Sequence, residues 1–478
     1  MASNSRERSV GYRTRANNRT EARDQPDMTT QFETPATRRR PVWFRLHRPI
    51  STAAAGVAVL GGLAVGVAPA ASAAVPPATN RISVDSKGGQ AAEYRSEPFA
   101  ASADGRYVAF TSAAPNLAPD DTNNTWDVLV RDRRTGTTSR VSQSTAGVAG
   151  DSSSYGHSLS PDGRYVSFTS DATNLVPGDT NGASDGFVHD RRTGSTSRVT
   201  LTNGNTQADA RSYAPAISAD ARFVAFVSEA TNVVPGDTNG LADIFLRDRQ
   251  AGTTVRVSGT NADAPSDAPA ISANGRYVTF TSEAALVGGD TNGIADVFIR
   301  DMRTGSLRRV NVSTTGAQAN ALTVSPTMSA DGRFVAFTSE AALVPGDTNG
   351  VADVFLRDLR AGTTIRVSLA ADGGQATGGS SYGPMMSVDG RHVVFSSDAT
   401  NLVSGDTNGV ADVFLRDLRT GTTVRASLAA DGGQGNDGSY NGVVTRDGRY
   451  VAFASTATNL VPGDTNGVTD AFLRHMPR

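Results

Sequence analysis

The sequence contains no cysteine. This absence excludes disulfide bonds, thiolate catalysis, cysteine-based zinc sites and a lipidated N-terminal cysteine. Aromatic residues make up only 6% of the 478 residues and charged residues only 19%, so the chain lacks the high charge that is typical of general disorder. A folded chain of this length holds either two or three ordinary domains or one large repeat assembly.

The chain also lacks a long hydrophobic run. Its main apolar stretch covers 15 residues, 53 to 67, whereas a transmembrane helix needs about 18 to 20, so a membrane anchor is disfavoured. Residues 1–50 hold 11 arginines against 5 acids, and small residues follow the apolar stretch. A basic region, an apolar core and a small-residue site near Ala73 or Ala74 predict a cleaved secretory leader over residues 1–74.

This leader predicts a secreted or extracytoplasmic protein of the cell envelope, with no stable membrane span after its removal. Arg39-Arg40 resembles a twin-arginine signal only loosely, so the Sec and twin-arginine routes both stay open, and Met28 is a second candidate start. Residues 51–478 hold 42 acidic and 34 basic residues, a net charge of about −8. Such a surface repels nucleic acid, which disfavours a nucleic-acid partner.

Seven internal repeats follow the leader. The phrase SADGRYVAF at residues 102–110 returns six times with small changes, and the spacings between copies are 58, 58, 54, 57, 58 and 58 residues. The third residue of the phrase falls at Asp104, Asp162, Asp220, Asn274, Asp331, Asp389 and Asp447. Such regularity over seven copies indicates a repeat architecture.

Each repeat is predicted to form four short strands. Apolar residues alternate in segments such as RYVAFTS and ADVFLRDL, as expected of half-buried strands. Glycine in the ADG and RTG phrases supplies the positive φ that tight turns need, and no window shows a helical period. Four-stranded units repeated seven times predict an all-β fold, a seven-bladed β-propeller over residues 75–478.

The two ends of this predicted propeller complement each other. The chain stops after DAFLRHMPR, so the seventh repeat lacks its fourth strand, and the mature N-terminus opens with NRISVDSKGGQA. That opening matches IRVSLAADGGQA at residues 365–376, which contains the fourth strand of another repeat. We therefore expect residues 81–84 to complete the last blade, so that the N-terminal strand closes the ring.

The phrases SPDGRYVSF and SADGRFVAF, followed by segments such as DVFLRDLRTGT, resemble the TolB-like propeller repeat, also called the WD40-like or PD40 repeat. The resemblance covers about residues 81–478 and implies a propeller of the secreted bacterial type. TolB itself carries a separate N-terminal domain, for which this sequence has no room. The resemblance therefore implies a fold, and TolB's role in an envelope transport complex is not expected here.

Tyrosine and glutamine recur in the loops between repeats. Aromatic rings with amide side chains nearby are able to hold a sugar or an extended peptide, so these residues are candidate ligand-binding residues at one mouth of the central channel. The alternative is that the tyrosines pack between blades and the glutamines cap loop backbone. The candidates are Tyr155, Tyr213, Tyr382 and Tyr440, with Gln90, Gln207, Gln318, Gln375 and Gln434.

Asp, Asn and a second Asp recur at fixed spacing between the second and third strands of each repeat, in words such as DTNGVAD. We name these seven segments the DTNG loops. Their candidate metal ligands are Asp121, Asn123 and Asp127; Asp179, Asn181 and Asp185; Asp237, Asn239 and Asp243; Asp290, Asn292 and Asp296; Asp347, Asn349 and Asp353; Asp406, Asn408 and Asp412; and Asp464, Asn466 and Asp470.

These loops resemble the calcium loops of other propellers, with two residues missing. Three side chains fall short of the six to eight oxygens that calcium prefers, so backbone and water would have to supply the rest. The alternative is an Asx turn whose second Asp accepts bonds from amides or from a neighbouring arginine. Both interpretations stay open, and calcium is the one candidate cofactor.

No set of residues predicts catalysis. His157, His189, His392 and His475 break the repeat pattern, but none lies near a triad-like set of residues and no G-x-S-x-G word occurs. The arginines after DG, such as Arg106, are expected to form ion pairs between blades. We predict a monomeric exported propeller that acts as a non-catalytic binding or scaffold module.

Its ligand is expected to be a protein, peptide or glycan, held on the face that bears the DTNG and inter-blade loops. The alternative is a hydrolase or lyase acting on glycan or peptide at the channel mouth. A catalytic site should place a lopsided cluster of histidines and acids on one rim of the channel, whereas a scaffold should show near-sevenfold chemistry. The arrangement of the rim therefore discriminates between the two.

Overall fold

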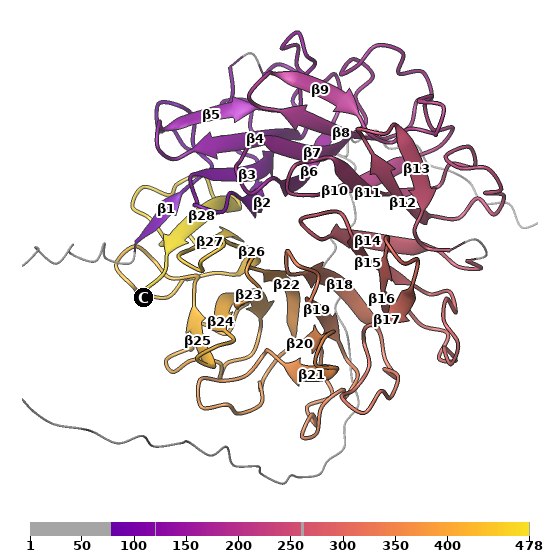
Figure 1. The fold of residues 1–478 in the computed structure, drawn as a ribbon. Coiled ribbons are helices and arrows are strands. Elements are labelled where there is room, and N and C mark those ends of the chain that lie inside the picture. The colour runs from indigo at the N-terminus through magenta and orange to yellow at the C-terminus, as the bar shows by residue number, and fades with distance from the viewer. Residues whose placement is uncertain (1–77, 120, 260–261, 478) are drawn as a thin grey trace, which may run out of the picture. The chain divides into compact units, whose positions relative to one another are not determined.

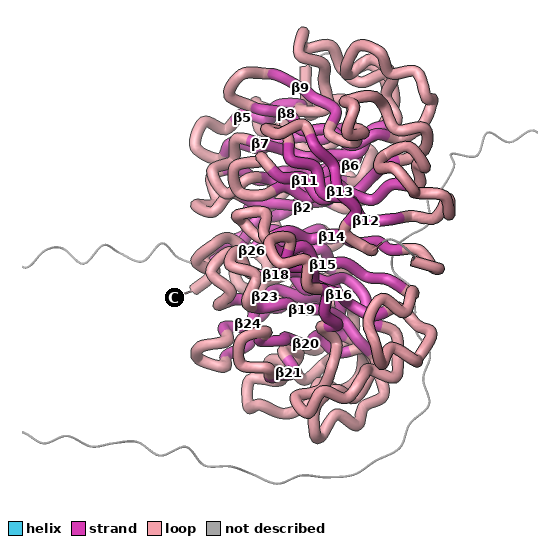
Figure 2. Tube along the Cα trace, turned by 45° about the vertical axis from the view of Figure 1, so that its right-hand side comes forward, coloured by secondary structure: helices cyan, strands magenta, loops and turns pink. Residues whose placement is uncertain are grey.

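The computed structural model describes residues 78–119, 121–259 and 262–477, and every regular element in this part of the chain is a β-strand. The strands form seven four-stranded antiparallel sheets around a central opening (Figure 1). Figure 2 shows that loops alone join them. The structure thus confirms the predicted all-β, seven-bladed propeller. The predicted leader, residues 1–74, lies outside the described residues.

Six blades each take four consecutive strands, from the innermost to the outermost. Blade 1 holds β2 (Ser96–Ala101), β3 (Tyr107–Ser112), β4 (Asp127–Asp132) and β5 (Thr137–Arg140); blade 2 holds β6 (Ser154–Leu159), β7 (Tyr165–Ser170), β8 (Asp185–Asp190) and β9 (Ser195–Arg198); blade 3 holds β10 (Ser212–Ile217), β11 (Phe223–Ser228), β12 (Asp243–Asp248) and β13 (Thr253–Arg256).

The next three blades follow the same order. Blade 4 holds β14 (Ser266–Ile271), β15 (Tyr277–Ser282), β16 (Asp296–Asp301) and β17 (Leu307–Arg309); blade 5 holds β18 (Thr323–Met328), β19 (Phe334–Ser339), β20 (Asp353–Asp358) and β21 (Thr363–Arg366); blade 6 holds β22 (Ser381–Met386), β23 (His392–Ser397), β24 (Asp412–Asp417) and β25 (Thr422–Arg425).

The seventh blade combines both ends of the described chain. Its sheet has the order β1 (Thr79–Arg81), β28 (Asp470–His475), β27 (Tyr450–Ser455) and β26 (Ser439–Val444), and Figure 1 shows β1 beside β28. The strand lies two residues before the predicted position at 81–84. The reason is that Val84 already pairs with Gln90 in a small hairpin, so the chain turns away from β28 after Ser83.

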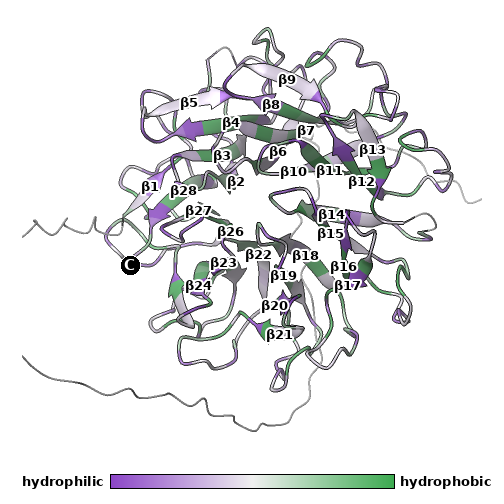
Figure 3. Cartoon of the chain, in the orientation of Figure 1, coloured by the Kyte–Doolittle hydropathy of each residue, from purple (hydrophilic) through white to green (hydrophobic). Residues whose placement is uncertain are grey.

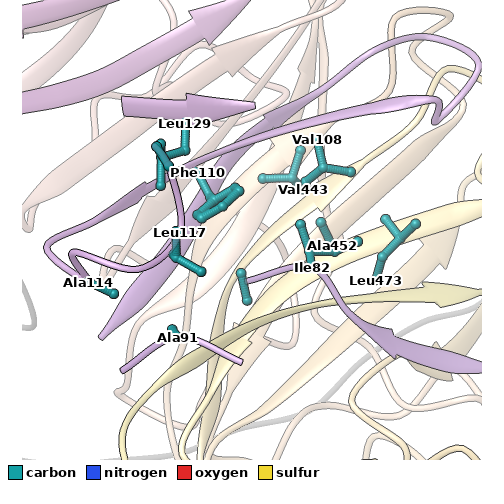
Figure 4. Close-up of a cluster of buried hydrophobic side chains, with 12 residues drawn as sticks. Ile82, Ala91, Val108, Phe110, Ala114, Leu117, Leu129, Val443, Ala452 and Leu473 are labelled. Atoms are coloured by element: carbon teal, nitrogen blue, oxygen red, sulfur yellow. The ribbon is translucent and has the colours of Figure 1, made fainter. Parts of the chain in front are cut away.

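The core lies between neighbouring blades. In blades 2 to 7 a phenylalanine of the second strand stacks on one of the third, with ring centroids 5.6–6.0 Å apart, and Figure 3 shows hydrophobic residues along the middle strands. Between blades 1 and 7, Phe110 and Val108 pack with Val443 and Leu473 (Figure 4). Because each sheet buries a face against the next one, no blade completes its core alone.

Glycine in the ADG turns serves this packing. Gly163 has a φ of 73°, and a Cβ atom there would collide with the ring of Tyr107 in the preceding blade. Tyr107 in turn lies between the guanidinium groups of Arg106 and Arg191, at 4.6 and 4.2 Å from its centroid. The repeated phrase DGRY therefore forms a contact between blades as well as a turn.

The expectation of inter-blade ion pairs for the arginines after DG is wrong. Each pairs with the aspartate that ends the third strand of its own blade, because the second and third strands are antiparallel neighbours. The six pairs are Arg106–Asp132, Arg164–Asp190, Arg222–Asp248, Arg276–Asp301, Arg333–Asp358 and Arg391–Asp417, at 2.5–2.7 Å. In blade 7, His475 takes the aspartate's place and Arg449 pairs with Asp447.

Candidate functional site

Each DTNG loop encloses an arginine from the outermost strand of its blade. The guanidinium nitrogens lie 2.9–3.9 Å from both carboxylates of the loop. The arginines are Arg81, Arg140, Arg198, Arg256, Arg309, Arg366 and Arg425, and all seven are nearly buried. Their recurrence at one position of every repeat is the sequence signal that could have located this network.

The second Asp of each loop has a further partner. In blade 2 the Thr200 hydroxyl donates to Asp185 at 2.7 Å and also accepts the backbone N–H of Gly186 at 3.1 Å. Ser83, Ser142, Ser258, Asn311, Ser368 and Ser427 donate to the corresponding carboxylates of the other blades. The carboxylate is therefore held by two side chains from the end of the outermost strand.

The Asn of each DTNG loop links the loop to the segment that leads to the next blade. Its Nδ2 donates to a backbone carbonyl of that segment at 2.7–3.4 Å in all seven blades. In blade 2, for example, Asn181 donates to Ala208, while its Oδ1 accepts the N–H of Ala183 in an Asx turn. These bonds tie the loop to the segment that leads to the next blade.

The candidate glutamines belong to the same network rather than to the tyrosine positions. Gln207 Nε2 donates to Asp179 and Asp185 at 2.8 and 3.2 Å, and Gln318 contacts Asp290 and Asp296 in the same way. Gln90, Gln375 and Gln434 accept from the arginine of their network, Arg81, Arg366 and Arg425. In the structure the predicted glutamines and tyrosines therefore do not form one common site.

Each network holds two carboxylates against one guanidinium group. Burial, with the neighbouring Asp353, raises the pKa of Asp347 to about 6. Burial likewise raises the pKa of Asp127 to about 6, although Arg140 opposes the shift. Each network thus carries one negative charge more than its arginine neutralises.

This geometry fits a guanidinium group better than calcium. The arginine stands where a cation shared by the two carboxylates would stand, and the loops' Asn Nδ2 atoms point to carbonyls. Within the described ranges, no group of three or more His, Asp or Glu side chains is placed to hold a metal ion. Calcium binding by the DTNG loops stays a prediction, tested below.

The four candidate tyrosines occupy the second position of β6, β10, β22 and β26, which surround the central opening (Figure 1). All four are half-buried, and burial raises the pKa of Tyr213 and Tyr382 to about 12. The same position holds Glu97 in blade 1, Asp267 in blade 4 and Val324 in blade 5. These residues form a ring of positions that we name the channel rim.

The rim lies on the face that bears the DTNG loops. Glu97 pairs with Thr111 near the end of β3, and the DTNG loop of blade 1 follows that strand. The tight ADG and RTG turns connect the opposite ends of the strands. Function is more often carried by long loops on a rigid scaffold than by two-residue turns.

A second ring of residues stands beside the rim. In six blades the residue before the third-strand Asp accepts the backbone N–H of the serine that opens the next blade, as Trp126 does from Ser154 at 2.7 Å. The same bond is made by Ser184, Ala242, Ala352, Ala411 and Thr469. Trp126 is therefore a bulky substitute at a position where small residues suffice for the fold.

Trp126 forms a cluster with rim residues of blades 1 and 2. Its ring centroid lies 6.2 Å from that of Tyr155, with the rings tilted by 35°. The Arg95 guanidinium lies 5.2 Å over the indole, and Arg95 Nε lies 3.6 Å from Glu97 Oε1. Asn441 of blade 7 donates to Glu97 Oε2 at 3.3 Å. We name Arg95, Glu97, Trp126, Tyr155 and Asn441 the aromatic cluster.

Sequence reasoning found only Tyr155 of this cluster. Trp126 offered a signal, because it is the one tryptophan of the repeat region and replaces Ala, Ser or Thr of the other copies. Other blades differ at the rim: Arg211 stacks on Tyr213 at 4.3 Å, whereas blade 5 presents Val324 next to Ala295 of blade 4. The rim is therefore not sevenfold in its chemistry.

The four histidines lie in three blades, two of them in blade 2, and do not converge on one site. His157 lies two residues after Tyr155 in β6. It shares a hydrogen bond of 2.8 Å with Thr169, and burial lowers its pKa to about 4. His189 bonds Thr196 at 2.9 Å, with its pKa lowered by burial to about 4. His392 lies 4.0 Å from Asp417, and His475 packs on Tyr450. In each case the partner of the histidine lies on the adjacent strand of the same sheet.

No protein-family model matches the sequence, and no curated protein does. Solved structures do resemble it. An oligogalacturonate lyase in complex with manganese shares 13% identity at a TM-score of 0.51, covering 84% of this chain and 97% of that one. The Vibrio parahaemolyticus oligogalacturonate lyase shares 12% at 0.50, covering 84% and 98%.

TolB from Acinetobacter baumannii shares 16% identity at a TM-score of 0.35, covering 79% of this chain and 82% of that one. At 13% and 12% identity, the likeness to the two lyase structures shows a common β-propeller fold and leaves function to the site.

Proposed function

We propose that this protein is an exported, monomeric binding module, non-catalytic, whose ligand contacts the channel rim on the face of the DTNG and inter-blade loops. The observation that carries the proposal is the unequal rim. Residues that serve the fold, such as the seven network arginines, are the same in every blade. Residues that differ between blades at one half-buried ring are not fixed by the repeated fold and are therefore the candidates to contact a ligand.

The broken symmetry also favours a specific ligand over a passive scaffold. Blades 7, 1, 2 and 3 supply Tyr440, Glu97, Tyr155 and Tyr213, with Trp126 beside them. Aromatic side chains with polar tips are the residues most enriched at binding sites, because they bury a large area at small entropic cost. A protein, peptide or glycan is the class of ligand that such a rim suits.

The competing hypothesis is a lyase or hydrolase at the same rim. The fold shared with oligogalacturonate lyases is compatible with this hypothesis. One of those structures contains manganese. In the described part of this chain no three His, Asp or Glu side chains converge on a metal position, so its residues do not fit such a site. His157 is uncharged near neutral pH and engaged with Thr169.

The test is retention of the labelled full chain on glycan and peptide arrays. We expect retention that falls at least tenfold in a Tyr155→Ala/Tyr213→Ala variant. The control is Arg134→Ala, an exposed residue of an RTG turn on the opposite face, which should bind as the parent chain does. Loss of binding in the control alone, or no retention on either array, contradicts the proposal. Cleavage of a bound glycan or peptide would establish the enzyme instead.

A further inference from the structure

The indole of Trp126 is not required by the fold. The bond that its backbone makes to Ser154 is made equally well at this position by alanine in blades 3, 5 and 6. A half-buried indole still leaves part of its apolar surface in water, which disfavours the folded state unless something covers it. The side chain therefore has a use other than holding blades 1 and 2 together.

The neighbours of Trp126 define what that use is. Trp126 and Tyr155 place two aromatic rings side by side, 6.2 Å apart and tilted by 35°. Arg95 lies over the indole, and its side chain is 51% exposed. Two flat apolar faces with polar groups at their margin suit a ligand that is itself flat and apolar on its faces and polar at its edges.

The polar margin of the cluster is close to neutral. Arg95 and Glu97 lie 3.6 Å apart and offset each other's charge, and Asn441 adds an uncharged amide 3.3 Å from Glu97. A paired guanidinium and carboxylate still offer hydrogen-bond donors and acceptors, but they give no net attraction to a strongly charged ligand. The cluster thus favours hydroxyl groups over phosphates, carboxylates or ammonium groups.

We propose that the aromatic cluster binds a neutral pyranose ring of an oligosaccharide. The ring's C–H face stacks on Trp126 and Tyr155, and its hydroxyls bond to Glu97, Asn441 and Arg95. This inference rests on the proposed function and names the ligand class for the rim. A peptide fits less well, because it is usually held by an apolar anchor pocket, and two cavities of the described chain lie away from the cluster, at blade 7's outer strand and between blades 3 and 4.

The experiment uses the full chain with Trp43→Phe, because the sequence has two tryptophans and this change leaves Trp126 as the sole reporter. The probes are cellotetraose, xylotetraose, mannotetraose and maltotetraose at millimolar concentration, with tetragalacturonate as the charged comparison. We expect at least one neutral saccharide to give a saturable blue shift of Trp126 emission, since stacking removes the indole from water.

Calorimetric titration then separates the cluster from the rest of the rim. Trp126→Ala and Tyr155→Ala should each weaken binding at least tenfold, and Trp126→Phe should weaken it less. The control is Arg134→Ala, an exposed RTG-turn residue on the opposite face, which should leave the affinity unchanged. Thermal unfolding checks that each variant folds, as alanine at the Trp126 position does in four other blades.

The inference is overturned if none of the four neutral saccharides binds, if only tetragalacturonate binds, or if Trp126→Ala and Tyr155→Ala bind as the parent does. It also falls if Arg134→Ala loses as much affinity as Tyr155→Ala. The proposed function fails separately. A peptide retained on the array in a Tyr155-dependent manner would sustain the binding module while overturning the saccharide.

Discussion

A single arginine per blade decides the electrostatics of each DTNG loop. In blade 2, Arg198 lies 3.0 Å from Asp179 and 3.2 Å from Asp185, and all three side chains are shielded from water. Buried pairs of this kind contribute little compared with a well-packed apolar substitute, but removal of one partner strands the other charge. Removal of the arginine is therefore expected to cost much more stability than the intact ion pairs contribute.

We predict that Arg198→Met lowers the free energy of unfolding by about 3–5 kcal/mol, because two buried carboxylates lose their counter-charge. Guanidinium chloride denaturation of the purified protein measures the change. The control is Arg449→Met, whose pair with Asp447 is 40% and 46% exposed; it should change stability by no more than about 0.5 kcal/mol. Equal costs in the two variants would contradict the prediction.

The same carboxylates predict a stability maximum in mildly acidic solution. Because the pKa values of Asp347 and Asp127 are raised to about 6 in the fold, the folded state binds more protons than the unfolded state between about pH 4 and 6. Their contribution to stability is present below about pH 4 and is lost as the pH rises through 6.

The aspartates paired with the DG arginines act in the opposite sense. Their arginine partners lower the pKa of Asp248 and Asp358 to about 2, so their contribution is present above about pH 4 and is lost as the pH falls towards 2. Urea unfolding across pH 2–8 should show the maximum, and Asp347→Asn should flatten the fall between pH 4 and 6. An unchanged profile in that variant would refute the assignment.

At the scale of the element, the DTNG loop is the one whose role the sequence left open. Its Asn makes an Asx turn in six copies. In all seven copies the Asn also bonds to the inter-blade segment and the two aspartates enclose a guanidinium group. The loop's side-chain oxygens at alternate positions suggested calcium. The same spacing of carboxylates also suits the guanidinium group of an arginine. The sequence could not separate the two, because the arginine arrives from a strand 13 to 19 residues away, as Arg366 does to Asp353 and Asp347.

We expect chelated protein to show no rise in melting temperature on addition of millimolar calcium, because Arg366 and its counterparts already stand between the two carboxylates of each loop. An ion that binds only the folded state at a hundredfold excess over its dissociation constant would add about 2.7 kcal/mol per site. A calcium-specific rise that disappears when Asp347 and its six counterparts become Asn would establish the DTNG loops as metal sites. Magnesium at equal concentration is the control for ionic strength.

Elements that repeat were predictable and contacts that do not repeat were not. Four strands per blade and the glycine turns follow from patterns present seven times. The aromatic cluster joins residues of three blades, with Trp126 reaching Tyr155 and Asn441 reaching Glu97 across 344 residues. Such pairs leave no local periodicity, and only the departure of Trp126 from the repeat pointed to them.

At the scale of the whole molecule, the seventh blade depends on β1. Asn80 pairs with Leu473 in the middle of that three-residue strand, and Ser83 bonds the buried Asp470. We predict that Asn80→Pro lowers the unfolding free energy by at least about 1 kcal/mol, because proline removes a ladder hydrogen bond. Chemical denaturation is the measurement, and Asn80→Ala, which keeps the N–H, is the control and should be neutral. Identical behaviour of the two variants would show that β1 adds nothing to the ring.

The pairing of β1 with β28 also sets an order in time. Thr79 accepts a hydrogen bond from Arg474, 395 residues further along the chain. Blades 1 to 6 each hold all four strands of their sheet in one consecutive stretch, but β1, made before all of them, must wait unpaired until β28 is made. We therefore expect the pairing of β1 with β28 to be a late, slow step of folding. A chain that stops short of β28 would leave β1 without a strand to pair with.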